Sequence, residues 1–288
     1  MSDLCYCQYA FTQSECRAQE IGPGVDPRFD VELIREGPIA ALASRVGFDE
    51  FAPERLQGTT AEDIQWLGKV AARHNEIICQ AASSAAVLPL RLGTMFQARD
   101  SLQAMLIRRQ STVAQFLQQL GNRQEWGVKL YLEGCGGQPP TVQSALAAVH
   151  ANQDRPLSSP LQPLPSHVGP PAPHYLGPPR AGTAYLTAKK AQLDDRRELR
   201  ANVHRTIQTV EERLTGAAEQ SCRIRNLPSG LTGRTEEMVF NAAYLLPSAA
   251  QASWLETVQH ICREVCDGLV LEISGPWPPY HFCPNLES

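Results

Sequence analysis

Apolar residues along the first half of the chain follow strand periodicity in four places. Residues 4–11 are apolar on both faces of a strand, which is typical of a strand buried in the middle of a sheet. Residues 31–34 and 39–46 flank a Gly-Pro turn, and this order predicts a hairpin. Residues 87–92 predict a short strand. Pro89 places that strand at a sheet edge or a bulge, because proline has no amide hydrogen to donate.

Two helices are predicted in the same half. The first begins at a capping box, with Thr59 as N-cap and Glu62 three residues later. Its apolar stripe has helical spacing and comprises Ile64, Leu67, Ala71, His74, Ile78 and Ala81. The second helix begins near Ser101 and ends at Gly121. Residues 126–132 then alternate as a strand, which we assign to the first domain.

The second half begins with a long helix, predicted over residues 182–219. Its apolar positions recur every three or four residues, at Leu199, Val203, Ile207, Val210 and Leu214. Charges of both signs occupy the opposite side, which indicates a solvated face. Strands at 221–226 and 238–246, a helix carrying Trp254 and a last strand at 269–273 follow.

Prolines divide the chain. Nine of its 22 prolines lie between residues 156 and 179, where neither a helix nor a central strand is compatible with so many missing amide donors. We therefore predict an α+β protein of two domains: an N-terminal α+β domain at 1–137, a helical and proline-rich linker at 138–180, and a smaller C-terminal α+β domain with a long helix at 181–288.

Composition narrows the class of function. A net charge of −4 supplies no basic field for nucleic-acid phosphates. No apolar run approaches the ~20 residues that span a bilayer, so we expect no membrane partner. The first ten residues lack the pattern of a signal peptide, and the nine scattered cysteines are typical of reduced, buried thiols. These features predict a cytoplasmic protein.

No motif for phosphate binding, for a nucleophile elbow or for a metal-binding helix occurs in the sequence. His74 lies on an apolar helical stripe, where a buried structural histidine is the favoured interpretation and a catalytic base the alternative. We therefore expect no cofactor and no catalytic residue.

Four residues near the C-terminus keep one enzymatic alternative open. Zinc accepts the side-chain types of Cys262, Cys266, His281 and Cys283, so a zinc-binding enzyme is a possible reading. Buried cysteines that pack as small apolar side chains are the favoured interpretation, because the helix around them also carries core residues.

Arg91 is a charge in the otherwise apolar run of residues 87–93. A charge in such a place has to be paired or reach solvent. We consider two roles for it, an ion pair across the sheet and a contact with a partner at the edge strand.

The stiff, aromatic end of the chain is the other candidate binding element. Gly275 permits unusual backbone angles, and three prolines within four residues restrict the path that follows. Trp277, Tyr280 and Phe282 project from this frame. The frame either folds back to clamp the C-terminal domain or the domain junction, or docks a partner, since rigid aromatic side chains anchor interfaces; a loop of an enzyme active site is the third alternative.

Four stretches in order resemble one known family. They are VLPLRLGTMF at 87–96, EWGVKLYLE at 125–133, GTAYLTAKKA at 182–191 and ISGPWPPYHF at 273–282, together with ARHNEII around His74. The sequence resembles the gas vesicle protein L / gas vesicle protein F family from residue 4 to 282. The resemblance implies a ferredoxin-like N-terminal domain and a non-enzymatic accessory protein of gas vesicle formation.

The same resemblance implies the partners, namely the main gas vesicle shell protein and other accessory proteins. An assembly factor would bind the hydrophobic shell protein before or during shell growth, by strand addition near Pro89 and Arg91 or in an apolar groove between the domains. A minor structural component would stay in the finished shell. The sequence leaves both open, with Arg91, Trp277, Tyr280 and Phe282 as candidate partner-binding residues and the cytoplasm and gas vesicle as the location.

Overall fold

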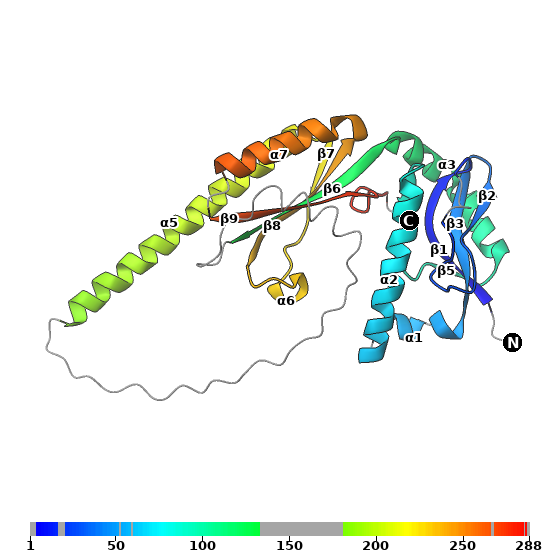
Figure 1. The fold of residues 1–288 in the computed structure, drawn as a ribbon, viewed down its shortest axis with the longest axis horizontal. Coiled ribbons are helices and arrows are strands. Elements are labelled where there is room, and N and C mark those ends of the chain that lie inside the picture. Colours follow the sequence, from blue (N-terminus) through cyan, green and yellow to red (C-terminus); the bar gives the residue numbers. More distant parts are fainter. Residues whose placement is uncertain are drawn as a thin grey trace.

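The chain forms two antiparallel sheets, each covered by helices, that lie side by side (Figure 1). The computed structural model describes residues 4–16, 21–51, 53–58, 60–132, 181–265, 268–284 and 286. The fold class is α+β, as predicted. The linker expected at 138–180 and the candidate ligand Cys266 lie outside the described residues.

The first sheet has the strand order β2-β3-β1-β4. Its strands are β1 (Leu4–Gln13), β2 (Glu32–Glu36), β3 (Ile39–Gly47) and β4 (Val87–Pro89), and the short β5 (Met95–Phe96) also pairs with β1. Helix α2 (Ala61–Ala82) packs on one face and α3 (Arg99–Leu120) on the other. The short helix α1 (Pro53–Leu56) precedes α2. The predicted hairpin is confirmed as β2–β3.

Strand β1 is buried on both faces because it is the strand with helices above and below. Cys5, Cys7 and Tyr9 belong to the core beneath α2, whereas Phe11 belongs to the core beneath α3. The change of face coincides with a shift of the β1–β3 register between Gln8 and Ala10, which is the effect of one extra residue in a strand. The prediction of a central strand with two apolar faces is confirmed.

Helix α2 begins one residue later than predicted. Thr60 is the N-cap, and its hydroxyl and the carboxylate of Asp63 form the capping box, so the expected pair Thr59 and Glu62 was wrong. The predicted inward residue Ile64 is 61% exposed. His74 is buried as expected; its Nε2 lies 3.1 Å from the Leu90 carbonyl oxygen, and burial lowers its pKa.

Strand β4 ends before Arg91. Its place at the end of the strand order confirms that Pro89 lies in an edge strand. Residues 90–94 then turn, and both the amide and the hydroxyl of Thr94 donate to the Arg91 carbonyl oxygen. The expectation that Arg91 interrupts a strand was therefore wrong: it is an exposed residue of a turn between two short strands.

The second sheet has the strand order β7-β8-β6-β9. Its strands are β6 (Arg123–Leu132), β7 (Gln220–Arg223), β8 (Met238–Pro247) and β9 (Leu269–Trp277). Strand β6 was assigned to the first domain, but it pairs with β8 and β9 and is central to this sheet. The assignment failed because alternation identifies a strand and says nothing of its partners.

Helices α5 (Ala181–Gly216) and α7 (Gln251–Val265) pack on one face of the second sheet. With them the elements follow the order β-α-β-β-α-β, which is the order of the ferredoxin-like motif. This motif was expected in the N-terminal domain, and that expectation was wrong: the first sheet and its main helices have the order β1-β2-β3-α2-β4-β5-α3. The small helix α6 (Ser229–Thr232) follows β7 and precedes β8 in the chain, and in Figure 1 it lies below the sheet, on the side away from α7. Among the described residues, no helix has the length and apolar character needed to cross a membrane.

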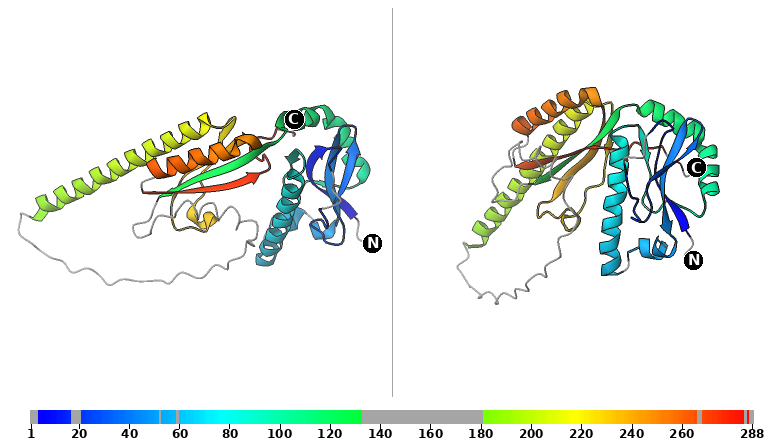
Figure 2. Two further views of the ribbon diagram at one scale, coloured as in Figure 1. Left: turned by 45° about the horizontal axis from the view of Figure 1, so that its top comes forward. Right: turned by 45° about the vertical axis from the view of Figure 1, so that its right-hand side comes forward.

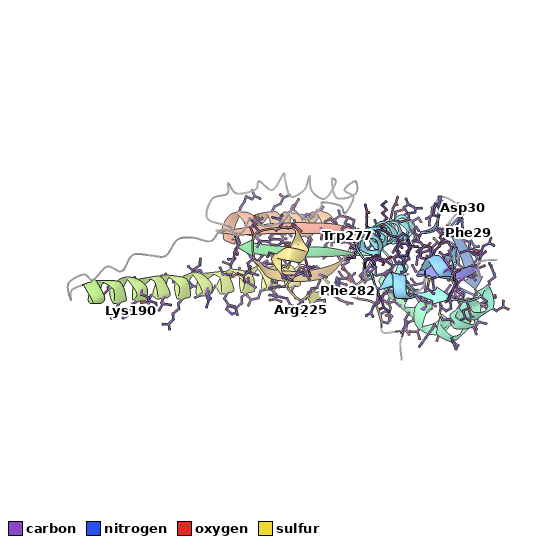
Figure 3. All side chains as sticks on the ribbon, turned by 90° about the horizontal axis from the view of Figure 1, so that it is seen from below. Phe29, Asp30, Lys190, Arg225, Trp277 and Phe282 are labelled. Atoms are coloured by element: carbon purple, nitrogen blue, oxygen red, sulfur yellow. The ribbon has the colours of Figure 1, made fainter. Side chains whose placement is uncertain are left out.

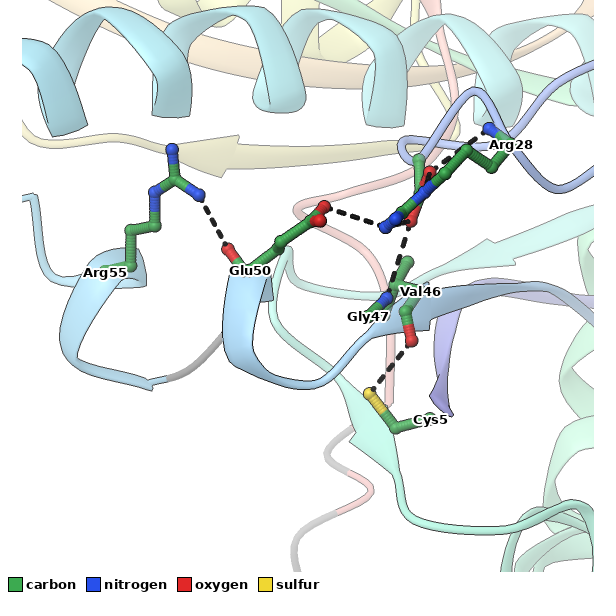
Figure 4. Close-up of polar contacts among 7 residues, drawn as sticks. Cys5, Arg28, Val46, Gly47, Glu50 and Arg55 are labelled. Carbon is green, nitrogen blue, oxygen red and sulfur yellow. Dashed lines mark hydrogen bonds and ion pairs between the residues drawn. The ribbon is translucent and has the colours of Figure 1, made fainter. Parts of the chain in front are cut away.

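A buried carboxylate fastens the loop that crosses the end of the first sheet. Asp26 is 2% exposed and accepts hydrogen bonds from Arg28 Nε at 2.8 Å, Arg28 Nη2 at 2.6 Å and the Gly47 amide at 3.4 Å. Arg28 also bonds Glu50, whose own carbonyl oxygen accepts from Arg55 (Figure 4). The hydrogen bond from Arg28 lowers the pKa of Asp26.

We expect Asp26→Asn to reduce the free energy of unfolding by about 1–3 kcal/mol at neutral pH, because it removes a charged acceptor from a buried site. The pKa of Asp26 is lower in the folded than in the unfolded protein. Its carboxylate therefore stabilises the fold fully above the unfolded pKa, near 4, and this stabilisation disappears as the pH falls through the folded pKa. Urea titrations between pH 2.5 and 7 measure both effects. The exposed Asp30→Asn is the control, and an equal loss in both variants would contradict the prediction.

Candidate functional site

The tail, residues 275–284, runs from the second sheet across to the first. Trp277 is the last residue of β9 and pairs with Glu125 near the start of β6. Pro278 and Pro279 are buried, and Phe282 is half-buried. Figure 3 shows Trp277 and Phe282 where the second sheet meets the first sheet and its helices.

The tail begins within the end of β9, at a glycine that no other residue replaces without strain. Gly275 has φ of +134°, a region that side chains disfavour. A Cβ atom there would lie 2.9 Å from the Glu125 carbonyl oxygen and 3.1 Å from the Trp126 ring. The backbone of the tail therefore lies directly against β6.

A buried carboxylate holds the tail after its prolines. The His281 amide donates to Glu125 Oε2 at 2.8 Å, and His281 Nδ1 lies 2.6 Å from Glu125 Oε1. Glu125 is 4% exposed. The hydrogen bond to Glu125 raises the pKa of His281, which favours an imidazolium–carboxylate pair.

Further contacts join the tail to the first sheet and its helices. The Tyr280 hydroxyl donates to Asn75 Oδ1 of α2 at 2.9 Å. Cys283 and Leu286 pack against the core between the first sheet and α3. The prediction that the tail folds back and clamps the domain junction is thus confirmed.

A chain of contacts through α2 connects Tyr280 of the tail to the segment that carries Arg91. Asn75, the partner of Tyr280, follows His74, and His74 contacts the carbonyl oxygen of Leu90, the neighbour of Arg91. Tyr280 is 39% exposed and Arg91 is exposed, so both side chains reach solvent. We use the name junction surface for the exposed residues at the two ends of this chain of contacts, Arg91 and Tyr280, with Asn75, the partner of Tyr280.

The proposed zinc ligands do not converge. Cys262 packs against the core of the second sheet and Cys283 against that of the first, while His281 is bound to Glu125. No cluster of three or more metal-ligating side chains occurs within the described part of the chain. Burial raises the pKa of Cys283 to about 12, so its thiol stays protonated and is a poor nucleophile.

Glu125 was not predicted. It is the one acidic residue of β6, but Arg123 and Gln124 precede it, so the sequence does not set it in an apolar run like that around Arg91. A buried charge has to be paired, and once the burial of Glu125 is known this rule predicts a partner without identifying His281. The arrangement fixes the tail and the two sheets to each other.

Comparisons with known proteins agree with this fold. The family model described as "Gas vesicle synthesis protein GvpL/GvpF" matches residues 5–284. A gas vesicle protein L from Streptomyces sp. (strain CB03234) is 26% identical over 253 residues, which cover 87% of this chain and 82% of that protein.

Two crystal structures are similar in fold. Gas vesicle protein GvpF from Anabaena sp. PCC7120 superposes with a TM-score of 0.59 at 16% identity, covering 98% of this chain and 97% of that chain. GvpF from Microcystis aeruginosa gives a TM-score of 0.59 at 15% identity, covering 98% and 99%. At these identities the similarity concerns the fold alone.

Proposed function

Because this chain belongs to the GvpL/GvpF family of gas vesicle synthesis proteins, we propose that it is a non-enzymatic accessory protein that binds the main gas vesicle shell protein during assembly. It acts in the cytoplasm, at the growing vesicle, together with other accessory proteins. The observation that carries the proposal is the junction surface. It exposes Arg91 and Tyr280 on a rigid frame, and the sequence contains no motif for a phosphate-binding loop, a nucleophile elbow or a metal-binding helix.

Rigidity favours binding at this place. Tyr280 is fixed by its bond to Asn75, and the backbone behind it is fixed by Glu125, so a partner would order few side chains on contact. Tyrosine and arginine are the residue types that most often contribute strongly to interfaces. Trp277 and Phe282 are half-buried and lie where the two sheets meet (Figure 3).

The strands next to Arg91 are too short to offer many free backbone groups for strand addition by a partner. Strands β4 and β5 have three and two residues, and a turn separates them. Strand β9 is an end strand of nine residues, and within the described ranges no other strand pairs with its outer edge. We therefore propose that side chains of the junction surface make the first contact, and that main-chain pairing, where it occurs, uses β9.

Co-expression with the main shell protein, followed by affinity capture of this chain after gentle lysis, tests the proposal. We expect wild type to capture the shell protein and Arg91→Ala to capture about tenfold less, as for the loss of a strong interface residue. Arg108→Ala, an exposed arginine on α3, is the matched control and should capture like wild type. Circular dichroism confirms that each variant folds.

Failure of wild type to capture any shell protein would contradict direct binding. An equal loss of capture in Arg91→Ala and Arg108→Ala would contradict binding at the junction surface. It would indicate that the positive charge of the chain as a whole promotes capture. Loss in a folded Trp277→Ala variant with normal capture by Arg91→Ala would confine the contact to the tail.

A further inference from the structure

Helix α5 is much longer than the sheet on which it packs. It has 36 residues, and its contacts with the second sheet come from the C-terminal half, through Val203, Ile207, Val210 and Leu214. The N-terminal half projects beyond the sheet in every view (Figures 1 and 2). The packed length thus accounts for about half of the helix.

The heptad position of the buried residues of α5 carries leucine again in the projecting half. Leu186, Leu193, Ile207 and Leu214 are separated by multiples of seven residues, which places them on one side of the helix, with Arg200 between the two pairs. Where the sheet covers this side, Leu214 is buried. Beyond the sheet, Leu186 is 65% and Leu193 is 50% exposed, and Leu199, on another side of the helix, is 59% exposed. Leu199 was expected to face the core from its helical spacing with Val203, and this expectation was wrong.

Positive charge lies beside these leucines. Residues 186–200 contain five Lys or Arg and three Asp or Glu, a net charge of +2 in a chain of net charge −4. Lys190 and Arg197 are also seven residues apart, so they form one edge of the stripe; Figure 3 shows Lys190 far out on the projecting half. Asp194 lies 4.0 Å from Arg197 and compensates it weakly in solvent.

These charges disfavour a second copy of the chain as the occupant. In an antiparallel pair of α5 helices, the edge with Lys190 and Arg197 would face the same edge of the other copy. In a parallel pair, Arg200 would meet its own counterpart, because it occupies the heptad position of Leu186 and Leu193. Both pairings bring like charges together.

We propose that the projecting half of α5 docks an amphipathic helix of another protein, one that carries Glu or Asp along the border of its apolar stripe. Leucines of both helices pack in the seam, and the acidic border lies against Lys190 and Arg197. This interaction is separate from the junction surface and does not depend on shell-protein binding.

A pair of designed helical peptides tests the docking. Both have 21 residues with leucine at the a and d positions; one carries Glu and the other Lys at the flanking positions. Fluorescence anisotropy with the full chain is expected to show the Glu peptide binding at least about tenfold more tightly than the Lys peptide, with an advantage that shrinks as salt is added.

Three variants locate the site. Leu186→Gln combined with Leu193→Gln should weaken binding of the Glu peptide about tenfold or more, while Leu231→Gln, at a leucine that is 74% exposed on α6, should leave it unchanged. Lys190→Glu combined with Arg197→Glu should reverse the preference toward the Lys peptide. All substitutions are on exposed positions, so folding is expected to persist.

Several results would overturn the proposal. They are no binding of either peptide, equal binding of both, or an unchanged preference after charge reversal. Strong amide protection of residues 186–200 in the chain alone would show that another part of this chain already covers the stripe. A dimer in sedimentation that the double leucine variant dissociates would make a second copy the occupant.

Discussion

Replacing Gly275 by alanine is expected to lower the free energy of unfolding by about 2–5 kcal/mol, since it combines backbone strain with overpacking. The strain arises from φ of +134°. The overpacking arises because the new Cβ would lie 2.9 Å from a backbone oxygen and 3.1 Å from the ring of Trp126, which is itself buried. Neither neighbour has room to move.

Gly68 provides the matched control for this prediction. It lies within α2, and a Cβ atom there would have no other atom within 4 Å. Gly68→Ala should therefore raise stability by about 0.5–1 kcal/mol, the usual preference of a helix for alanine. Thermal and urea unfolding of the two variants give the comparison, and a Gly275→Ala variant as stable as wild type would refute the packing of the tail on β6.

Replacing Glu125 by alanine is expected to cost about 2–4 kcal/mol and to release the tail, because the backbone amide and the Nδ1 atom of His281 lose their acceptor. This expected loss of stability is smaller than for a fully buried ion pair, because the His281 side chain is 41% exposed. Hydrogen exchange should show faster exchange at residues 280–284, with the strands of the first sheet unchanged. Glu211→Ala, which removes an exposed pair with Arg223, should cost less than about 1 kcal/mol.

The Glu125–His281 pair also makes a prediction about pH. The folded pKa of His281 is raised, so the pair contributes most below the unfolded pKa, near 6.5, and its contribution disappears as the pH rises through the folded value. An NMR titration of His281 should give a pKa above that of an exposed histidine, and Glu125→Gln should lower it. A His281 pKa that is the same in both proteins would contradict the pair.

Local features of the fold could be read from the sequence. The two apolar faces of β1, the β2–β3 hairpin and the edge position of Pro89 each follow from a pattern within a few residues, and each is present in the structure. The unusual backbone at Gly275 was also expected, because a glycine before a proline-rich segment marks a position that other residues disfavour.

Long-range relations could not be read in this way. The sequence identified β6 as a strand, but its partners β8 and β9 lie more than 100 residues away, and no local pattern encodes that choice. The capping box of α2 was displaced by one residue because two threonines and two acidic residues at 59–63 offer equivalent spacings. Local competition of this kind is decided by tertiary packing.

The candidate site was predicted in part. The clamping role of the tail was expected from its prolines and aromatic residues, but Glu125 and Asn75, which hold it, were not. Arg91 was singled out as a charge in an apolar run, yet it lies in a turn and not in a strand. The residues that hold the tail, and the point at which β4 ends before Arg91, both depend on how distant segments of the chain pair in space. The local sequence does not specify that pairing.

A photocrosslinking experiment tests the central claim most directly. A photoreactive phenylalanine analogue is placed at position 91 or, as the control, at position 108 on α3, and each variant is co-expressed with the main shell protein and irradiated. Binding at the junction surface predicts an adduct with the shell protein from position 91 and little or none from position 108. No adduct from position 91, or equal adducts from both positions, would contradict shell binding at this surface.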